Sequence, residues 1–210
     1  MGKMIFKFPV LFTILFNIKD AGIMILMIIG IKMPIATSMG TGKCPVMKNC
    51  TVLVWSNFQG IWYEYASYGD YTTRSLYKCM KYTFSTTETE VNAVREFVSK
   101  WNDGLSSTNY EVQYDGFFDF ILKTESGSEE KIWVLETDYN NFAILWTCYD
   151  YGALGEYFYM ESSWILTRTS KEYAAVDVEI KIDEALKRHS IERISYDPVE
   201  REDCPNYPNN

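Results

Sequence analysis

The strongest constraint on this chain is a series of eight short segments, each rich in aromatic and β-branched residues. The segments are 61–68, 77–86, 90–101, 110–118, 119–124, 131–137, 142–149 and 156–167. The runs between several of them carry turn-forming residues, for example Asn102-Asp103-Gly104, Glu125-Ser126-Gly127-Ser128, Asn140-Asn141 and Gly152-Ala153-Leu154-Gly155. Strands this close in sequence join as hairpins, so the spacing predicts an all-β fold with antiparallel up-and-down strands. Eight such strands can close into a β-barrel whose interior holds one small ligand.

One helix is predicted near the end of the chain, over 171–189. Thr169-Ser170-Lys171-Glu172 resembles a capping box at its start. Its apolar residues share one face at helical spacing: Ala175, Val178, Ile182, Ala185 and Leu186. Segment 142–149 has bulky residues in both strand phases, which indicates a strand covered on both sides. We therefore expect one C-terminal α-helix packed on the outside of the barrel at this strand.

The N-terminal region, residues 1–38, is predicted to be a secretory signal peptide. Lys3 and Lys7 precede two apolar runs, 8–16 and 21–31, and each run is shorter than the ~20 residues that span a bilayer. Small residues at 36–38 suit a cleavage site, with 38–40 as an alternative, and Met24 or Met27 could be the natural start. An uncleaved anchor formed by both runs would bury Lys19 and Asp20 at high cost. We therefore expect a secreted, extracellular domain over 42–210 without stable membrane insertion.

Charge and histidine content exclude several functions. The formal net charge is -8, which disfavours a nucleic-acid partner because like charges repel. The single histidine, His189, lies at the end of the predicted helix, so no imidazole is expected inside the barrel to ligate haem or a metal ion. For the same reason no Ser/His or Cys/His pair is expected in the cavity. The sequence therefore predicts a protein that is not an enzyme and requires no cofactor.

Five cysteines follow the predicted cleavage site, and none has the spacing of a zinc or redox motif. An odd number allows two disulfides and leaves one thiol, but the residue pattern leaves the pairing open. Asn49-Cys50-Thr51 is a glycosylation sequon whose middle residue makes it a poor acceptor, so occupancy stays open. Cys50 precedes the first long strand, where it could form a bridge to a second chain or tether a pigment.

Three motifs carry a family resemblance. Gly60-Ile61-Trp62 resembles the G-x-W signature of lipocalins, Thr137-Asp138-Tyr139 their T-D-Y turn, and Arg168 the arginine that follows their last strand. They occur in the family's order and at suitable separations. The cysteine-containing segments around them are similar to the insect bilin-binding protein, insecticyanin and apolipoprotein D branch.

The resemblance implies several structural roles. It implies that Cys44 pairs with Cys148 and Cys79 with Cys204, and it gives Cys50 no bridge. It also places Trp62 at a closed barrel end with Arg168 across the indole, an interaction worth about 0.5 to 2 kcal/mol. Asp138 is expected to organise its turn rather than to act in catalysis.

Strand alternation predicts which residues line the cavity, although a slip of one residue would reverse each assignment. We take Arg168 and Trp62 as inward-facing, follow every second residue along their strands, and add residues from two mid-chain segments. The predicted ligand-binding residues are Glu64, Tyr68, Tyr110, Tyr114, Trp133, Leu135, Phe158, Met160 and Trp164. Ordinary core or helix-facing packing is the alternative for each. A mostly apolar lining with a few hydroxyls suits a planar conjugated molecule.

The sequence therefore predicts a secreted carrier of a small hydrophobic ligand. The branch resemblance implies a biliverdin-like bilin, and a lipid, retinoid or sterol would suit the same lining. Two alternatives stay open: a lipocalin that binds a protein through its loops, and an enzyme of the prostaglandin-synthase kind. The enzyme would need a thiol on a strand facing the cavity, and Cys50 precedes the strands.

Overall fold

A computed structural model describes residues 39–69, 71–114, 118–153 and 156–208, so the predicted signal peptide lies outside the described residues. The elements are β1 (Met39–Thr41), α1 (Trp55–Phe58), β2 (Gly60–Tyr68), α2 (Tyr71–Leu76), β3 (Tyr77–Thr86), β4 (Val91–Ser99), β5 (Leu105–Gln113), β6 (Asp119–Thr124), β7 (Glu129–Thr137), β8 (Phe142–Ala153), β9 (Glu156–Thr167), α3 (Val176–Arg188), a 3-10 turn (Arg193–Ser195) and β10 (Asp197–Pro198).

The predicted barrel is confirmed. Strands β2 to β9 pair antiparallel in sequence order, and β9 also pairs with β2, which closes the barrel. The short β1 pairs with β9, and the short β10 pairs with β2; both pairings are antiparallel. Two predicted strands had wrong boundaries: β5 runs from Leu105 to Gln113 rather than from 110 to 118, and β8 continues through Gly152 to Ala153. The second difference arises because Gly152 pairs with Tyr157 in the β8–β9 ladder. Gly152 therefore belongs to the strand and not to the predicted turn.

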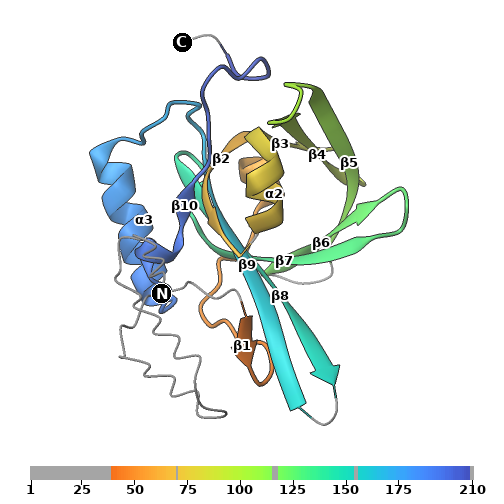
Figure 1. Ribbon diagram of the computed structural model, residues 1–210, viewed down its shortest axis with the longest axis vertical. Helices are drawn as coiled ribbons and strands as arrows, with labels where there is room; N and C mark the ends of the chain where they lie inside the picture. The colour runs from red at the N-terminus through yellow and green to blue at the C-terminus, as the bar shows by residue number, and fades with distance from the viewer. Residues whose placement is uncertain (1–38, 70, 115–117, 154–155, 209–210) are drawn as a thin grey trace, which may run out of the picture. The chain divides into compact units, whose positions relative to one another are not determined.

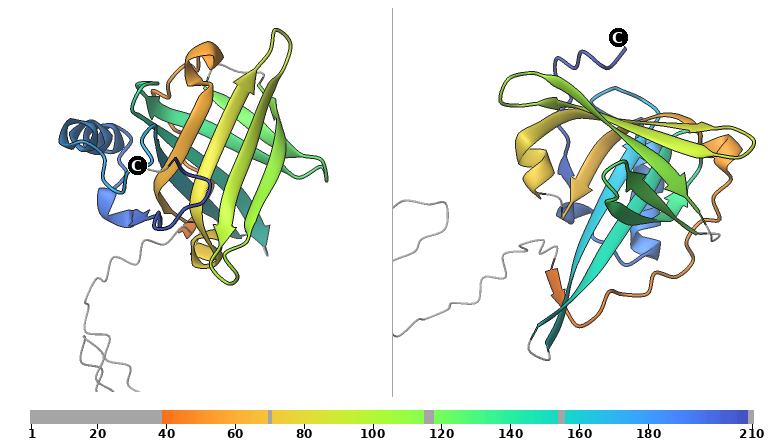
Figure 2. Two further views of the ribbon diagram at one scale, coloured as in Figure 1. Left: turned by 90° about the horizontal axis from the view of Figure 1, so that it is seen from above. Right: turned by 90° about the vertical axis from the view of Figure 1, so that its right-hand side faces the viewer.

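The barrel carries its long helix on the outside, as predicted (Figures 1 and 2). Helix α3 begins at Val176, so the predicted capping box at 169–172 was wrong. Its N-cap is Ala175, which makes no side-chain cap, and the Thr169 hydroxyl instead accepts the Lys171 backbone N–H within a local turn. His189 is the C-cap, as its position in the sequence indicated.

Two apolar clusters lie on opposite sides of one wall of the barrel. The inner cluster contains Ala143 and Leu145 of β8, and the outer cluster contains Ile144 and Trp146 of the same strand. The outer cluster also takes the buried face of α3: Val178, Ile182, Ala185 and Leu186. Strand β8 is therefore apolar in both phases because α3 covers the side that faces away from the interior.

Strand β2 changes phase near its middle. The register with β9 shifts between Glu64 and Ala66, so the strand carries a bulge at this point. A bulge adds one residue to one strand, and every side chain after it moves to the other face. Trp62 before the bulge and Ser67 after it therefore both face inward, whereas Ala66 joins the outer cluster.

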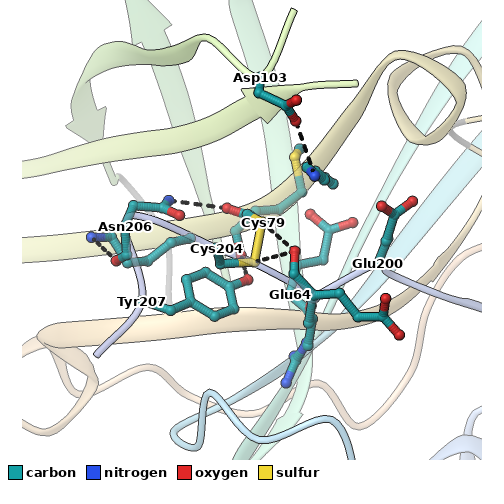
Figure 3. Close-up of a disulfide and its surroundings, with 12 residues drawn as sticks. Glu64, Cys79, Asp103, Glu200, Cys204, Asn206 and Tyr207 are labelled. Carbon is teal, nitrogen blue, oxygen red and sulfur yellow. Dashed lines mark hydrogen bonds and ion pairs between the residues drawn. A yellow bond between two sulfur atoms is a disulfide. The ribbon is translucent and has the colours of Figure 1, made fainter. Parts of the chain in front are cut away.

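The disulfide pairing implied by the family resemblance is confirmed. Cys44 bonds to Cys148 across 104 residues, and Cys79 bonds to Cys204 across 125. Figure 3 shows the second bridge with the C-terminal segment lying against β3, where Asn206 donates to the Cys79 carbonyl. Among the described cysteines, Cys50 alone is free.

The β8–β9 hairpin projects beyond the rest of the barrel, with β1 lying along it (Figures 1 and 2). Its pairing runs without interruption from Phe142 opposite Thr167 to Ala153 opposite Glu156. Met39 to Thr41 add a third strand on the β9 side. This projection places the last residues of β8 and the first of β9 away from the packed interior.

Candidate ligand-binding interior

One end of the barrel is closed by aromatic packing. Trp62 and Phe58 are fully buried, with ring centroids 5.0 Å apart. The Arg168 guanidinium lies 3.7 Å from the centroid of the Trp62 indole, as the resemblance implied. Gly60 adopts φ +96, and a Cβ there would meet the Arg168 guanidinium at 3.2 Å. This end therefore requires glycine, tryptophan and arginine at these positions.

The turn between β7 and β8 also belongs to the closed end. The Asp138 carboxylate accepts the backbone N–H groups of Asn141, at 2.7 Å, and Phe142, at 3.1 Å. Thr137 donates to the Phe142 carbonyl at 2.7 Å. The Tyr139 hydroxyl donates to the Val52 carbonyl and so holds the segment before α1. Asp138 thus organises a turn, as predicted.

The interior next to this end is apolar. The inner cluster there is aromatic: Phe58, Trp62, Tyr82, Phe84 and Phe120. Three of the predicted lining residues also face inward. Trp164 belongs to the inner cluster, Tyr110 packs against it, and Glu64 lies buried one inward position beyond Trp62.

Polar residues that the sequence analysis missed also face the interior. Arg95 lies over the Tyr82 ring at 5.6 Å from its centroid, and Glu130 pairs with Leu122 of the inner cluster. Burial raises the pKa of Tyr82 well above its ordinary value; Arg95 opposes that rise, and Glu64 adds to it. The alternation Val91, Ala93, Arg95 could have revealed the arginine. Ser67 could not have been found this way, because the bulge reverses its phase.

Three predicted lining residues do not face the interior. Tyr68 lies in the outer cluster, with its ring 4.9 Å from that of Tyr196, because it follows the β2 bulge. Trp133 packs against Trp146 beside the outer cluster, with ring centroids 5.2 Å apart. Leu135 belongs to the same outer cluster. Trp133 and Leu135 were placed in the wrong phase of β7, a slip of one residue.

The other three predicted lining residues lie away from the centre. Phe158 and Met160 are on the projecting hairpin, where Phe158 stacks on Tyr151 with ring centroids 5.5 Å apart. Met160 is partly exposed. Tyr114 is 54% exposed and contacts Trp55 of α1, at the closed end. Phe158 and Met160 share the inner strand phase but lie too far along the hairpin to reach the packed interior, and Tyr114 follows the end of β5.

The end of the barrel opposite Trp62, called here the far end, carries α2 in the connection from β2 to β3 (Figure 1). Arg74 of α2 donates to the Ser67 carbonyl at 2.8 Å and forms an ion pair with Asp197 of β10. These contacts hold α2 against the last residues of β2. The inner wall near this end carries hydroxyl and carboxylate groups, from Ser162 and Glu130. The Thr124 hydroxyl at the end of β6 is bonded within the following turn, where it accepts the Ser128 backbone N–H.

A hollow of about 500 Å³ is lined by residues of β4, β5, β6 and the turn after β6, so it is bounded by adjacent strands and not by opposite walls. Within the described ranges, no cluster of three or more His, Cys, Asp or Glu residues could hold a metal ion. No helix in that same part of the chain is long and apolar enough to cross a bilayer.

Comparison with known proteins identifies the family. Residues 45–176 match the Triabin family. The Lazarillo protein of Schistocerca americana is 26% identical over 153 residues, which cover 69% of this chain and 68% of that protein.

Solved structures share the fold. Insecticyanin from the tobacco hornworm Manduca sexta superimposes with a TM-score of 0.70 at 21% identity, covering 80% of this chain and 92% of insecticyanin. Lobster apocrustacyanin A1 gives 0.59 at 20% identity, with 76% and 92% covered. The amine-binding protein of Rhodnius prolixus, solved with tryptamine, gives 0.54 at 19% identity, with 75% and 86% covered. The chain belongs to the Triabin family of lipocalins and resembles the insect bilin-binding branch.

Proposed function

We propose that this protein is a secreted, non-enzymatic carrier that holds a small hydrophobic ligand inside its barrel. The observation that carries the proposal is the change in character along the inner wall. The closed end is lined by aromatic rings, and the far end by hydroxyl and charged groups. An elongated molecule with an apolar body and polar substituents would match this gradient.

The first ligand class that we propose is a biliverdin-like bilin. Its support is the family branch together with the fold shared with insecticyanin. A bilin is planar and conjugated, and the rings of Trp164, Tyr82 and Tyr110 offer inward aromatic surface. A lipid, retinoid or sterol would use the same apolar surface and is the alternative within the carrier function.

Export and non-covalent ligand binding belong to the same proposal. The two disulfides suit an oxidising compartment. Asn49 is exposed, as a glycan acceptor must be.

Burial, and then the nearby Asp119 carboxylate, raise the pKa of Cys50, which makes its thiol a slow nucleophile. A ligand held without a covalent bond is therefore the form we propose. The oxidising compartment that forms the two disulfides could also join Cys50 to a second chain.

The test is ligand binding by the secreted protein. The full chain would be expressed in insect cells, purified from the medium, and titrated with biliverdin, biliverdin dimethyl ester, retinyl acetate, palmitate and tryptamine. We expect saturable 1:1 binding of at least one apolar ligand. Absence of saturable binding across the panel would contradict the carrier function.

Two neighbouring substitutions on β6 locate the bound ligand. Thr124 pairs with the inward Tyr110, whereas Lys123 pairs with Glu111 in the opposite phase. Thr124→Trp should weaken binding at least tenfold, because the indole would occupy the interior. Lys123→Trp should leave the affinity unchanged. Equal effects of the two substitutions would place the ligand outside the barrel.

A further inference from the structure

Two buried polar atoms on the inner wall lack hydrogen bonds. The indole Nε1 of Trp164 and the hydroxyl Oγ of Ser67 have no hydrogen-bond partner among residues 39–69, 71–114, 118–153 and 156–208. Trp164 is 5% exposed and Ser67 is fully buried. An unpaired buried polar group destabilises the folded state, and native proteins contain few of them. These two atoms therefore point to a function that offsets this cost.

The two atoms come from neighbouring side chains on the inner wall. Ser67 of β2 lies directly opposite Trp164 of β9 in the register, so both side chains stand on the same face. Trp164 belongs to the inner cluster, and its neighbour across the other ladder, Leu145, does too. Both side chains are thus directed into the barrel.

The outer face of the same strands provides a contrast. Ser163, next to Trp164, is also fully buried, but it donates to the Leu145 carbonyl at 2.6 Å. It also accepts a hydrogen bond from the Tyr196 hydroxyl at 2.7 Å. The hydroxyl of the outward Ser163 therefore both donates and accepts a hydrogen bond, whereas the hydroxyl of the inward Ser67 has no hydrogen-bond partner. The β2 bulge creates this difference, because it turns Ser67 inward and Tyr68 outward.

We propose that the Trp164 Nε1–H and the Ser67 hydroxyl together bind an acceptor oxygen of the carried ligand and so fix its depth in the barrel. This inference rests on the proposed carrier function and adds the chemical class of the ligand. An indole N–H can only donate, so the ligand atom that it meets must be an acceptor. A carbonyl oxygen has two lone pairs and can accept from both groups at once.

Charge selects a neutral carbonyl over a carboxylate. The inward ionisable side chains on the barrel strands are Glu64, Glu130 and Arg95, two carboxyl groups and one guanidinium group. Glu64 lies on the same strand as Ser67 and is buried. A carboxylate ligand would add a third carboxyl group to this interior, where the low dielectric penalises each further negative charge. The ligand class is therefore an apolar skeleton that bears a lactam, ketone or ester carbonyl.

The experiment compares inward and outward substitutions that remove the same chemical groups. Trp164→Phe and Ser67→Ala each remove one donor from the proposed pair. Trp133→Phe and Ser163→Ala make the same changes on the outer face. The probes are biliverdin dimethyl ester and retinyl acetate, which bear lactam and ester carbonyls, and binding is measured by calorimetric titration of the full secreted chain.

We expect each inward substitution to weaken binding about fivefold to tenfold, the effect of one hydrogen bond, and each outward substitution to leave the affinity within about twofold. Retinoic acid should bind more weakly than retinyl acetate. Melting temperatures check folding: Ser67→Ala should melt at or above wild type, because it removes an unpaired hydroxyl, whereas Ser163→Ala should melt several degrees lower.

The failures are distinguishable. If the wild-type protein binds neither carbonyl probe, the donor-pair inference is overturned. The carrier function is then supported only if the wild-type protein binds another member of the ligand panel. If wild type binds a probe and both inward variants keep its affinity, the donor pair is overturned and the carrier function stands. Equal binding of retinoic acid and retinyl acetate would overturn the choice of a neutral carbonyl.

Discussion

Arg168 joins parts of the chain that are far apart in sequence. Its guanidinium covers the Trp62 indole and donates to the backbone carbonyls of Ile61, Gln59 and Tyr139 at 2.9 to 3.0 Å. Burial lowers the pKa of Arg168, yet its ordinary value is so high that the side chain stays charged at neutral pH. One side chain therefore ties the start of the barrel to its end.

Removal of this guanidinium should loosen the closed end. Arg168→Ala is expected to lower the free energy of unfolding by about 2–4 kcal/mol, because it removes a cation–π contact and leaves several carbonyls with weaker partners. Arg168→Lys should recover only part of the loss, since an ammonium group cannot reach as many acceptors. Urea denaturation measures both variants. A loss below about 0.5 kcal/mol for the alanine variant would contradict the structural role.

The Asp138 turn should respond to pH. Burial opposes ionisation of Asp138, but hydrogen bonds from Asn141 and Phe142 and the charge of Lys181 hold its pKa below the ordinary 3.8. The stabilisation from the charged form is therefore complete above the unfolded pKa and is lost as the pH falls through the folded pKa. Asp138→Asn should be less stable than wild type at pH 7, by about 1 kcal/mol, and the gap should narrow at pH 3. Denaturation at both pH values tests this, and a gap independent of pH would contradict it.

At the scale of elements, the outer helix and the barrel wall share one apolar cluster. Ile182 of α3 is fully buried in it, whereas Ile180, half a turn away, is 53% exposed. Both residues are isoleucines of the same helix, but helical geometry places them on different faces.

The two isoleucines give a matched comparison. Ile182→Ala should cost about 2–5 kcal/mol of unfolding free energy, because it leaves a cavity between α3 and β8. Ile180→Ala should change it by less than about 1 kcal/mol. Chemical denaturation of the two variants decides the matter. Similar losses would mean that α3 does not pack on the wall through the face described above.

For the whole molecule, two disulfides link the barrel wall to segments outside it. The Cys79–Cys204 bridge closes a loop of 125 residues and fixes the C-terminal segment against β3 (Figure 3). A cross-link over so long a loop restricts the unfolded chain strongly.

Loss of this bridge should be costly. Joint replacement of Cys79 and Cys204 by serine should lower the unfolding free energy by about 4–5 kcal/mol on the chain-entropy estimate. Cys50→Ser serves as the control, since it removes a free thiol, and should change stability by less than about 1 kcal/mol. Thermal and urea denaturation of the purified variants provide the measurement. A double variant as stable as the control would show that the C-terminal segment contributes little.

The sequence by itself determined the strand order, the outer helix and the roles of Trp62, Arg168 and Asp138. The strands, the helix and the Asp138 turn depend on local patterns of turn residues and alternation. The pairing of Trp62 with Arg168, far apart in sequence, came from the family resemblance. The alternation of β8 even predicted that one of its faces meets the interior and the other the helix.

Only the tertiary structure decided which residues face the interior. One bulge in β2 reversed the phase after Glu64, so Ser67 rather than Tyr68 lies inside, and a one-residue slip misplaced Trp133 and Leu135. Bulges and register depend on the pairing of two strands, which neither sequence segment specifies alone. The unpaired donors of Ser67 and Trp164 became visible only when β2 was paired with β9, because their position opposite each other is a property of the closed barrel.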